Sequence, residues 1–295
     1  ARMLNANVEA GEIKFPGDQG KPGVRDNLNE EVLFGKNGFA NVMYPELRAD
    51  LFFLLDDGWD VPYGINPYAH TAKFGSLNLN PDRFPSFKGS PGERLRQLVD
   101  RVRGFGWRGA GVWVACQSPG ESWSFHLKKD QLEEDLKKKL AWSAEAGVSY
   151  WKVDWGAHDG DIAYRARMTD LRNSYAPGLL LEHCRNFGGV PLNGCSLGWE
   201  GQKKVLNVGS GRLIGSFTET RQKEVEQVLA CSDVYRVYDM IAPLLYPSAI
   251  ERAAYYGSVA DRCGARAFIN VEDVPYLGAT LGHSLGIMRA PIWPV

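Results

Sequence analysis

The sequence predicts an α/β protein that folds as a (β/α)₈ barrel with a short irregular N-terminal arm. Apolar, strand-like runs alternate with amphipathic helical patterns along most of the chain. The alternating region covers about 260 residues, which is the usual length of such a barrel. No glycine-rich phosphate-binding motif follows any of these strands, so a doubly wound nucleotide-binding sheet is the second choice.

The predicted strands are short and follow an irregular first segment. Residues 1–30 are rich in glycine and proline and show no sustained periodicity, which is typical of an arm or irregular cap. The barrel domain is expected to cover residues 31–295. Apolar runs of strand type occur at residues 32–34, 51–55, 111–115, 149–153, 179–181 and 265–269.

Helical patterns lie between these runs. Residues 93–105 place leucines and valines on one face and end at Gly106. A second helix is expected to begin at Asp130, as its cap, and to end at Gly147. Two more are expected at residues 161–175 and 248–262.

The composition excludes several classes of partner. Lysine and arginine number 34 against 35 acidic residues, so the net charge of −1 argues against binding to nucleic acid or an anionic membrane. The longest apolar runs, such as residues 51–55, are too short to span a bilayer. The five cysteines lack the spacing of a disulfide framework or a zinc site, so neither is expected.

The compartment stays open. The N-terminus has no apolar signal core, but it also lacks an initiator methionine, as it would if a leader had been removed. An extracellular or periplasmic location is expected if a leader was removed, and a cytoplasmic one otherwise. The sequence does not indicate an oligomeric state.

Polar and aromatic side chains follow several of the predicted strands. In a parallel barrel these strand ends meet at one mouth, where active sites are built. An aspartate after a strand is also a common helix cap, but the recurrence at three strands favours a functional site. These strand ends are Asp56-Asp57-Gly58-Trp59, Lys152-Val153-Asp154-Trp155 and Glu182-His183-Cys184.

Lys152 and Asp154 stand two residues apart, so on a strand they point to the same side. A buried ion pair is the plain interpretation. The functional one is that an aspartate beside an ammonium stays ionised as a nucleophile, while the lysine donates to a substrate hydroxyl. Asp56 and Asp57 form either a turn or an acceptor pair for sugar hydroxyls, with Trp59 as an apolar wall.

Taken together, these motifs resemble the melibiase-type α-galactosidases, glycoside hydrolase families 27 and 36 of clan D. The resemblance covers roughly residues 35–240 and includes order and spacing. Besides the strand ends above, the motifs are Asn80-Pro81-Asp82-Arg83-Phe84-Pro85, Gly109-Ala110-Gly111-Val112-Trp113 and Cys231-Ser232-Asp233.

The resemblance implies a retaining hydrolase that uses no metal or organic cofactor and acts on an oligosaccharide or glycoside. By motif, Asp154 is the nucleophile and Asp233 the acid/base. Such enzymes place the two carboxyl groups about 5 to 5.5 Å apart. The resemblance also assigns substrate contacts to Asp56, Asp57, Trp59, Trp113, Lys152, Trp155, Glu182 and Cys184. Many of the similar enzymes make a further contact with an arginine at a position where this sequence has none. Arg185 and Arg236 are the candidates to replace it.

The expected activity is hydrolysis of terminal α-linked galactose by double displacement. The alternatives within the clan are an α-N-acetylgalactosaminidase, a β-L-arabinopyranosidase and a galactosyl transferase. An alternative of another class is a catalytically silent carbohydrate-binding barrel. Both expected carboxylates are present, which favours the enzyme.

Overall fold

The computed structural model describes residues 25–65, 70–184, 226–237 and 268–271, with side chains for all but residues 235–237 and 268–271. The chain divides into two compact units, residues 1–181 and 182–295.

The first unit is built on a parallel sheet. Strands β1 (Phe52–Leu55), β2 (Gly109–Val114) and β3 (Tyr150–Val153) lie next to one another in that order. The backbone N–H of Leu180, the first residue of β4 (Leu180–His183), donates to the carbonyl of Ser149 at 3.0 Å. All residues of β2 and β3 are buried, as expected for parallel strands covered on both faces. The strands predicted at 51–55, 111–115 and 149–153 are confirmed.

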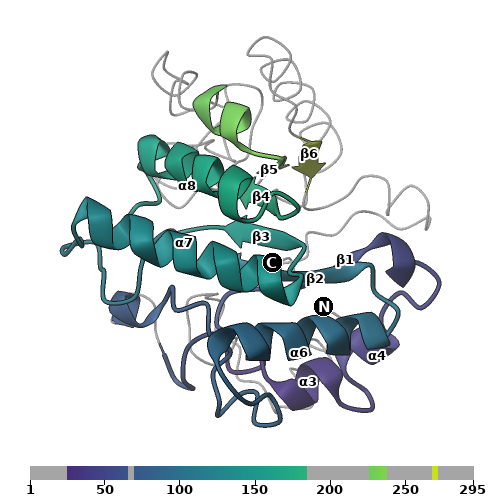
Figure 1. Cartoon of the computed structure of the whole chain (residues 1–295). Coiled ribbons are helices and arrows are strands. Elements are labelled where there is room, and N and C mark those ends of the chain that lie inside the picture. The colour runs from purple at the N-terminus through teal and green to yellow at the C-terminus, as the bar shows by residue number, and fades with distance from the viewer. Residues whose placement is uncertain (1–24, 66–69, 185–225, 238–267, 272–295) are drawn as a thin grey trace, which may run out of the picture. The chain divides into compact units, whose positions relative to one another are not determined.

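Three helices lie side by side along one face of this sheet (Figure 1). They are α6 (Pro91–Gly104), α7 (Lys129–Ala146) and α8 (Ile162–Tyr175). Ser90 and Glu93 form a capping box at the start of α6, and the predicted apolar stripe of this helix is buried. Asp161 caps α8 by accepting from the N–H of Tyr164 at 3.0 Å.

The predicted start of α7 at an Asp130 cap is wrong by two residues. The helix begins at Lys129 with Lys128 as its N-cap residue, and the Gln131 side chain accepts from the Lys128 N–H at 3.1 Å. Asp130 instead lies in the first turn, where its negative charge faces the positive end of the helix dipole. The helix ends as predicted at Gly147, which adopts a left-handed conformation.

The strand predicted at residues 32–34 is also wrong, because this run is part of helix α3 (Glu30–Phe34). The Asn29 side chain accepts from the Val32 N–H at 3.0 Å and so caps a helix that a run of three apolar residues does not reveal. Short elements follow it: α4 (Phe39–Val42), the 3₁₀ turn η1 (Arg48–Asp50) and, later, the 3₁₀ turn η2 (Thr71–Lys73).

Arg83 fixes the loop that precedes α6 against the segment before α3. Its buried guanidinium donates to the carbonyl of Arg25 at 2.7 Å and to the carbonyl of Val61 at 2.5 Å, and it pairs with Asp26 at 2.7 Å. The Arg83 motif named above is therefore structural. It holds Arg25 in place at the edge of the candidate site.

The second unit also contains parallel strands. Residue Glu182 of β4 pairs with Val234 of β5 (Val234–Val237), and β5 pairs along its length with β6 (Phe268–Val271). The strand predicted at 265–269 lies at 268–271 instead. The helix predicted at 248–262 falls outside the described residues.

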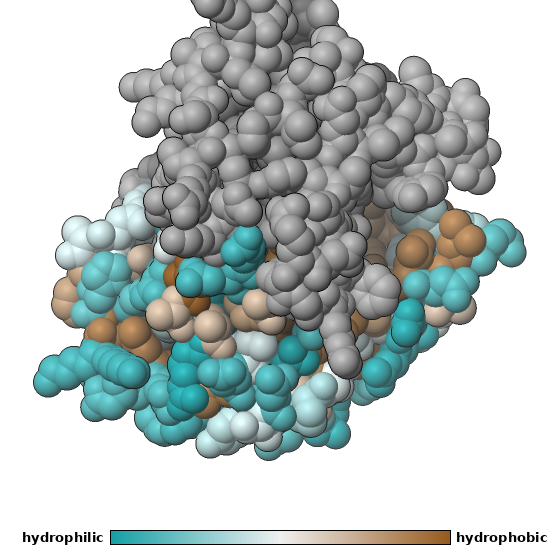
Figure 2. Space-filling model, turned by 90° about the horizontal axis from the view of Figure 1, so that it is seen from above, coloured by the Kyte–Doolittle hydropathy of each residue, from teal (hydrophilic) through white to brown (hydrophobic). Residues whose placement is uncertain are grey.

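The structure confirms an α/β fold with a parallel sheet. Closure into an eight-stranded barrel and the domain boundary near residue 30 stay predictions. In the described residues, no helix is long and apolar enough to cross a membrane. Among the coloured residues that can be seen in Figure 2, most are hydrophilic, and the hydrophobic ones form smaller groups between them.

Candidate active site

Three carboxylates and one ammonium gather where β1 and β3 end. Asp56 and Asp57 follow β1, and Asp154 follows β3, at the carboxyl edge of the same parallel sheet. Lys152 points to this group from within β3, and its Nζ lies 3.2 Å from both carboxylate oxygens of Asp56. The predicted Asp56, Asp57, Lys152 and Asp154 are therefore brought together.

The two ends of the Lys152–Asp56 pair differ in exposure. The lysine side chain is 2% exposed, whereas the aspartate side chain is 54% exposed. A buried ammonium needs a counter-charge, and here that charge lies at the solvent side. The pair thus places positive charge beneath a polar, open surface, which suits binding to hydroxyl groups.

Asp57 is held from two sides. The Arg25 guanidinium pairs with it, with Nε 2.9 Å from Oδ1, and the indole N–H of Trp155 donates to Oδ2 at 3.2 Å. Burial raises the pKa of Asp57, the arginine opposes this effect, and repulsion from Asp56 and Asp154 adds to it. The charges of Asp56 and Asp154 are therefore close enough to Asp57 to affect its protonation.

Asp154 is oriented by the neighbouring strand. Its Oδ2 accepts from the indole N–H of Trp113 at 3.0 Å, and its backbone N–H donates to the carbonyl of Val114 at 3.0 Å. The buried Arg165 donates to the Asp154 carbonyl at 2.9 Å. These three hydrogen bonds fix both the backbone and the carboxylate of Asp154 at the end of the strand.

Two of the predicted aromatic walls have another role. Trp59 is fully buried and donates from Nε1 to the carbonyl of Trp113 at 2.8 Å, and Trp113 itself is 1% exposed. These rings support the site from the core. Trp155 is partly exposed, and its ring lies 5.1 Å from that of Trp113 and 6.3 Å from that of the exposed Trp123.

Two glycines let the site loops approach closely. Gly58 has a φ of +112°, and a Cβ there would meet the Arg25 side chain at 2.8 Å. At Gly156 a Cβ would meet the backbone of Cys116 at 2.7 Å. The close approach at Gly156 brings the loop after β3 against the loop after β2.

Asp60 is a titratable group of this region that the sequence analysis missed. It is 7% exposed, and its Oδ2 accepts from the backbone N–H groups of Gly75 and Ser76 at 3.1 Å each, while its buried Oδ1 has no hydrogen-bond partner. Burial and the nearby Asp57 raise the pKa of Asp60 to about 6. Asp60 directly follows Trp59 in the sequence, and this position could have indicated that it belongs to the same region.

The remaining predicted site residues belong to the second unit. Glu182 and Cys184 are buried, and Asp233 is half-buried between the helical residues 226–231 and the start of β5. Arg236 lies in β5, but its side chain is outside the described residues, as is Arg185 altogether. Asp233 thus precedes a strand, whereas Asp56, Asp57 and Asp154 follow one.

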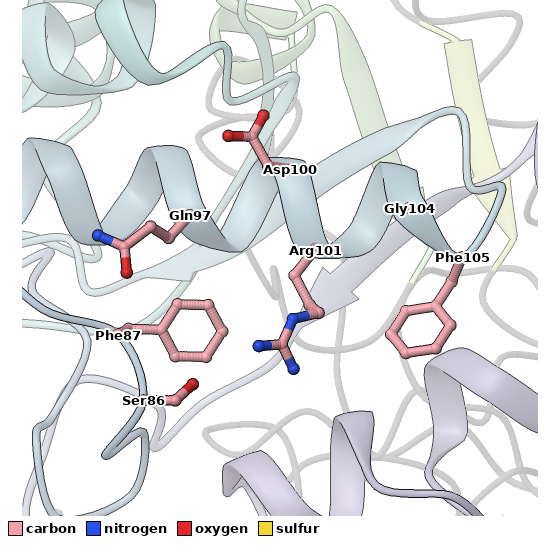
Figure 3. A pocket seen from close by; sticks show the side chains of 7 residues that line it. All are labelled: Ser86, Phe87, Gln97, Asp100, Arg101, Gly104 and Phe105. Carbon is pink, nitrogen blue, oxygen red and sulfur yellow. The ribbon is translucent and has the colours of Figure 1, made fainter.

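A cavity of about 480 Å³ lies away from these strand ends, between α6 and the segment around Phe87 (Figure 3). The Arg101 guanidinium points between the rings of Phe87 and Phe105 and lies 5.4 Å from the centre of the Phe87 ring. Phe105 precedes β2, so the cavity is at the amino end of that strand. We assign the candidate active site to the carboxylate cluster rather than to this cavity, because the cavity lacks a convergent set of reactive groups.

The chain has a distant structural likeness to a known protein. No family model matches the chain, and no curated protein sequence matches it. A solved structure similar to it is that of a variant of Abp, a GH27 β-L-arabinopyranosidase from Geobacillus stearothermophilus, in complex with arabinose, at 14% identity and a TM-score of 0.47. The match covers 79% of this chain and 56% of that one. A likeness at this level does not assign the chain to a family.

Proposed function

We propose that the protein is a retaining exo-glycosidase that hydrolyses terminal α-linked galactose or a closely related sugar. The observation that carries the proposal is the cluster at the sheet edge, where the indole-held Asp154 lies in one charged group with Asp56, Asp57 and Lys152. A carboxylate held in a fixed orientation beside acceptors and a donor for hydroxyl groups is the equipment of a glycosidase nucleophile and its sugar subsite.

The proposed reaction has two displacements. The Asp154 carboxylate attacks the anomeric carbon, the glycosidic bond breaks, and Asp233 gives its proton to the departing oxygen. Water then attacks the β-linked glycosyl ester, Asp233 takes a proton from that water, and Asp154 leaves as a carboxylate. The product keeps the anomeric configuration of the substrate because two inversions have occurred.

The first experiment measures turnover of a panel of nitrophenyl α- and β-glycosides, including galactosides, N-acetylgalactosaminides and arabinopyranosides. We expect the α-galactoside to be cleaved fastest and NMR to show an α-anomer as the first product. Fastest cleavage of another sugar would keep the mechanism and change the specificity. Sugar binding without any turnover would instead support the silent binding barrel.

The second experiment identifies the nucleophile. An activated 2-deoxy-2-fluoro glycoside slows the second step, so the glycosyl ester accumulates on the enzyme. Peptide mapping should place the label on Asp154, and the Asp154→Asn variant should not be labelled. A label on a different residue would reject the assignment.

A further inference from the structure

Two histidines and a glutamate from different loops converge beside the candidate active site. Glu121 and His126 belong to the loop between β2 and α7, and His158 belongs to the loop between β3 and α8. The potential ligand atoms of these three side chains all lie within 4.8 Å of one another. The Nε2 of His158 lies 3.0 Å from Oε1 of Glu121, and the two imidazole rings are 4.9 Å apart.

The Glu121 carboxylate is fully buried and rigidly held. Its Oε2 accepts from the Ser118 N–H at 2.8 Å, and its Oε1 accepts from the Leu127 N–H at 2.9 Å. Its Oε1 also lies 3.0 Å from Nε2 of His158, so hydrogen bonds fix the position of both carboxylate oxygens.

His158 is held in a fixed orientation. Its ring stacks on that of Tyr164, with the centres 4.4 Å apart and the planes at 23°. Its Nδ1 lies 3.9 Å from Oδ2 of Asp161, which is itself fixed as the cap of α8. The Asp161 carboxylate lies beyond hydrogen-bond distance of Nδ1, but it is on the side from which a carboxylate commonly orients a metal-binding histidine, while Nε2 faces Glu121.

We propose that Glu121, His126 and His158 bind a divalent transition metal ion, with Zn²⁺ as the best match. Two imidazole nitrogens and one carboxylate oxygen are ligands that zinc accepts, whereas calcium and magnesium prefer oxygen alone. Tetrahedral zinc needs ligand atoms about 3.3 Å apart, given bonds of about 2.0 to 2.1 Å. Rotation of the exposed His126 side chain supplies this closure, and water completes the coordination.

The ion would cross-link two loops that border the candidate site. Trp123 lies between two of the ligands in sequence, and its ring lies 6.3 Å from that of Trp155, whose N–H donates to Asp57. Binding would therefore fix this edge of the site without taking part in bond cleavage. The cysteine spacing that led us to expect no metal carries no information about this cluster, because its ligands come from separate loops.

The test is equilibrium dialysis of the full-length protein against Zn²⁺, with the bound metal measured by mass spectrometry. We expect one zinc per chain, and about 100-fold weaker binding by His126→Ala and His158→Ala, since each removes a ligand. Asp161→Asn should weaken binding about 10-fold, because it removes the charge beside Nδ1 of His158, while asparagine can still cap α8. The matched control is His70→Ala, an exposed histidine of another segment, which should bind like the parent.

A second measurement separates ligation from damage to the fold. His126 is exposed, so His126→Ala should keep the thermal midpoint of the metal-free protein, and His126→Cys should restore binding with a thiolate ligand. Cobalt in place of zinc should give the visible absorption of a tetrahedral site in the parent and not in His126→Ala. Absence of zinc binding by the parent, or equal binding by His126→Ala, would overturn the proposal.

Discussion

The buried ammonium of Lys152 is balanced by the carboxylate of Asp56, which lies 3.2 Å away and is half open to solvent. Lys152 belongs to β3 and Asp56 directly follows β1, and these two strands flank β2. A lysine buried among apolar neighbours is tolerated only when its charge is compensated. This pair places that compensation at the surface where a substrate would arrive.

A first prediction follows from the asymmetry of this pair. Asp56→Asn removes one of the carboxylates near a buried ammonium and should lower the free energy of unfolding by roughly 1 to 3 kcal/mol. Lys152→Met leaves behind a carboxylate that water can solvate, so it should cost clearly less. Urea unfolding of both variants measures the difference, and a larger loss in Lys152→Met would contradict the assigned roles of the two residues.

The same lysine gives a kinetic prediction. If Lys152 donates to a sugar hydroxyl, its replacement by methionine should lower kcat/KM about 10- to 100-fold, as expected for loss of a hydrogen bond to a charged group. Lys88→Met, at an exposed position in the loop before α6, is the control and should keep the parent value. An unchanged kcat/KM in Lys152→Met, with the fold intact, would leave the ion pair with a structural role only.

The nucleophile assignment predicts a much larger effect. Asp154→Asn should reduce kcat at least roughly 10³-fold, because an amide cannot form the glycosyl ester. Added azide should not restore a product of retained configuration. Trp113→Phe is a useful companion, since it removes the indole N–H that holds Oδ2, together with part of a buried ring, and should slow the reaction far less. Near-normal turnover by Asp154→Asn would refute the assignment.

The raised pKa of Asp60 predicts how stability depends on pH. In the folded protein the pKa is about 6, against an ordinary 3.8, so the unfolded chain releases this proton first as the pH rises. Stability should therefore fall between about pH 4 and pH 6, and each pKa unit is worth about 1.4 kcal/mol. The full cost, about 3 kcal/mol, should be present above pH 6 and absent below pH 4.

The measurement compares Asp60→Asn with the parent by urea unfolding at pH 4 and pH 7. The stability of the parent relative to the variant should be about 3 kcal/mol lower at pH 7 than at pH 4. Asp100→Asn, an exposed position in α6, should track the parent at both pH values. Parallel behaviour of the parent and Asp60→Asn would show that Asp60 is not held with a raised pKa.

The first unit was largely predictable because its signals are local. The apolar runs that became β1, β2 and β3, and the stripe of α6, follow directly from periodicity. The strand ends Asp56, Lys152 and Asp154 meet because parallel strands present their carboxyl ends at one edge. The strand predicted at residues 32–34 was wrong because the N-cap at Asn29 makes this run helical, and the spacing of its apolar side chains does not reveal that cap.

Other features depend on contacts that no local pattern records. Trp59 reads as a pocket wall in the sequence, yet its N–H is satisfied by a carbonyl deep in the core. The raised pKa of Asp60 arises from burial, which depends on the packing of the whole unit. The Glu121, His126 and His158 cluster joins two loops through the close approach at Gly156, and sequence spacing does not show such an approach.

Three carboxylates compete for the role of acid/base in the proposed mechanism. Asp233 matches a motif of the enzymes that the sequence resembles, but it precedes β5, whereas catalytic groups of parallel α/β folds gather after the strands. Asp239 stands two residues after the last residue of β5 in the sequence and is the natural competitor, with Glu219 as another. Leaving-group chemistry distinguishes these carboxylates, because an aglycone that departs unaided needs no proton.

If Asp233 is the acid, Asp233→Ala should nearly abolish cleavage of natural galactosides and keep the first step on a dinitrophenyl glycoside. Azide should then speed turnover by attacking the β-linked intermediate, giving an α-glycosyl azide of net retained configuration. Asp239→Ala and Glu219→Ala, assayed in parallel, should show no such dependence on the leaving group. If Asp233→Ala slows good and poor leaving groups equally while Asp239→Ala shows the dependence and the azide rescue, the proton donor is Asp239. The active site would then draw all its carboxylates from residues that follow strands.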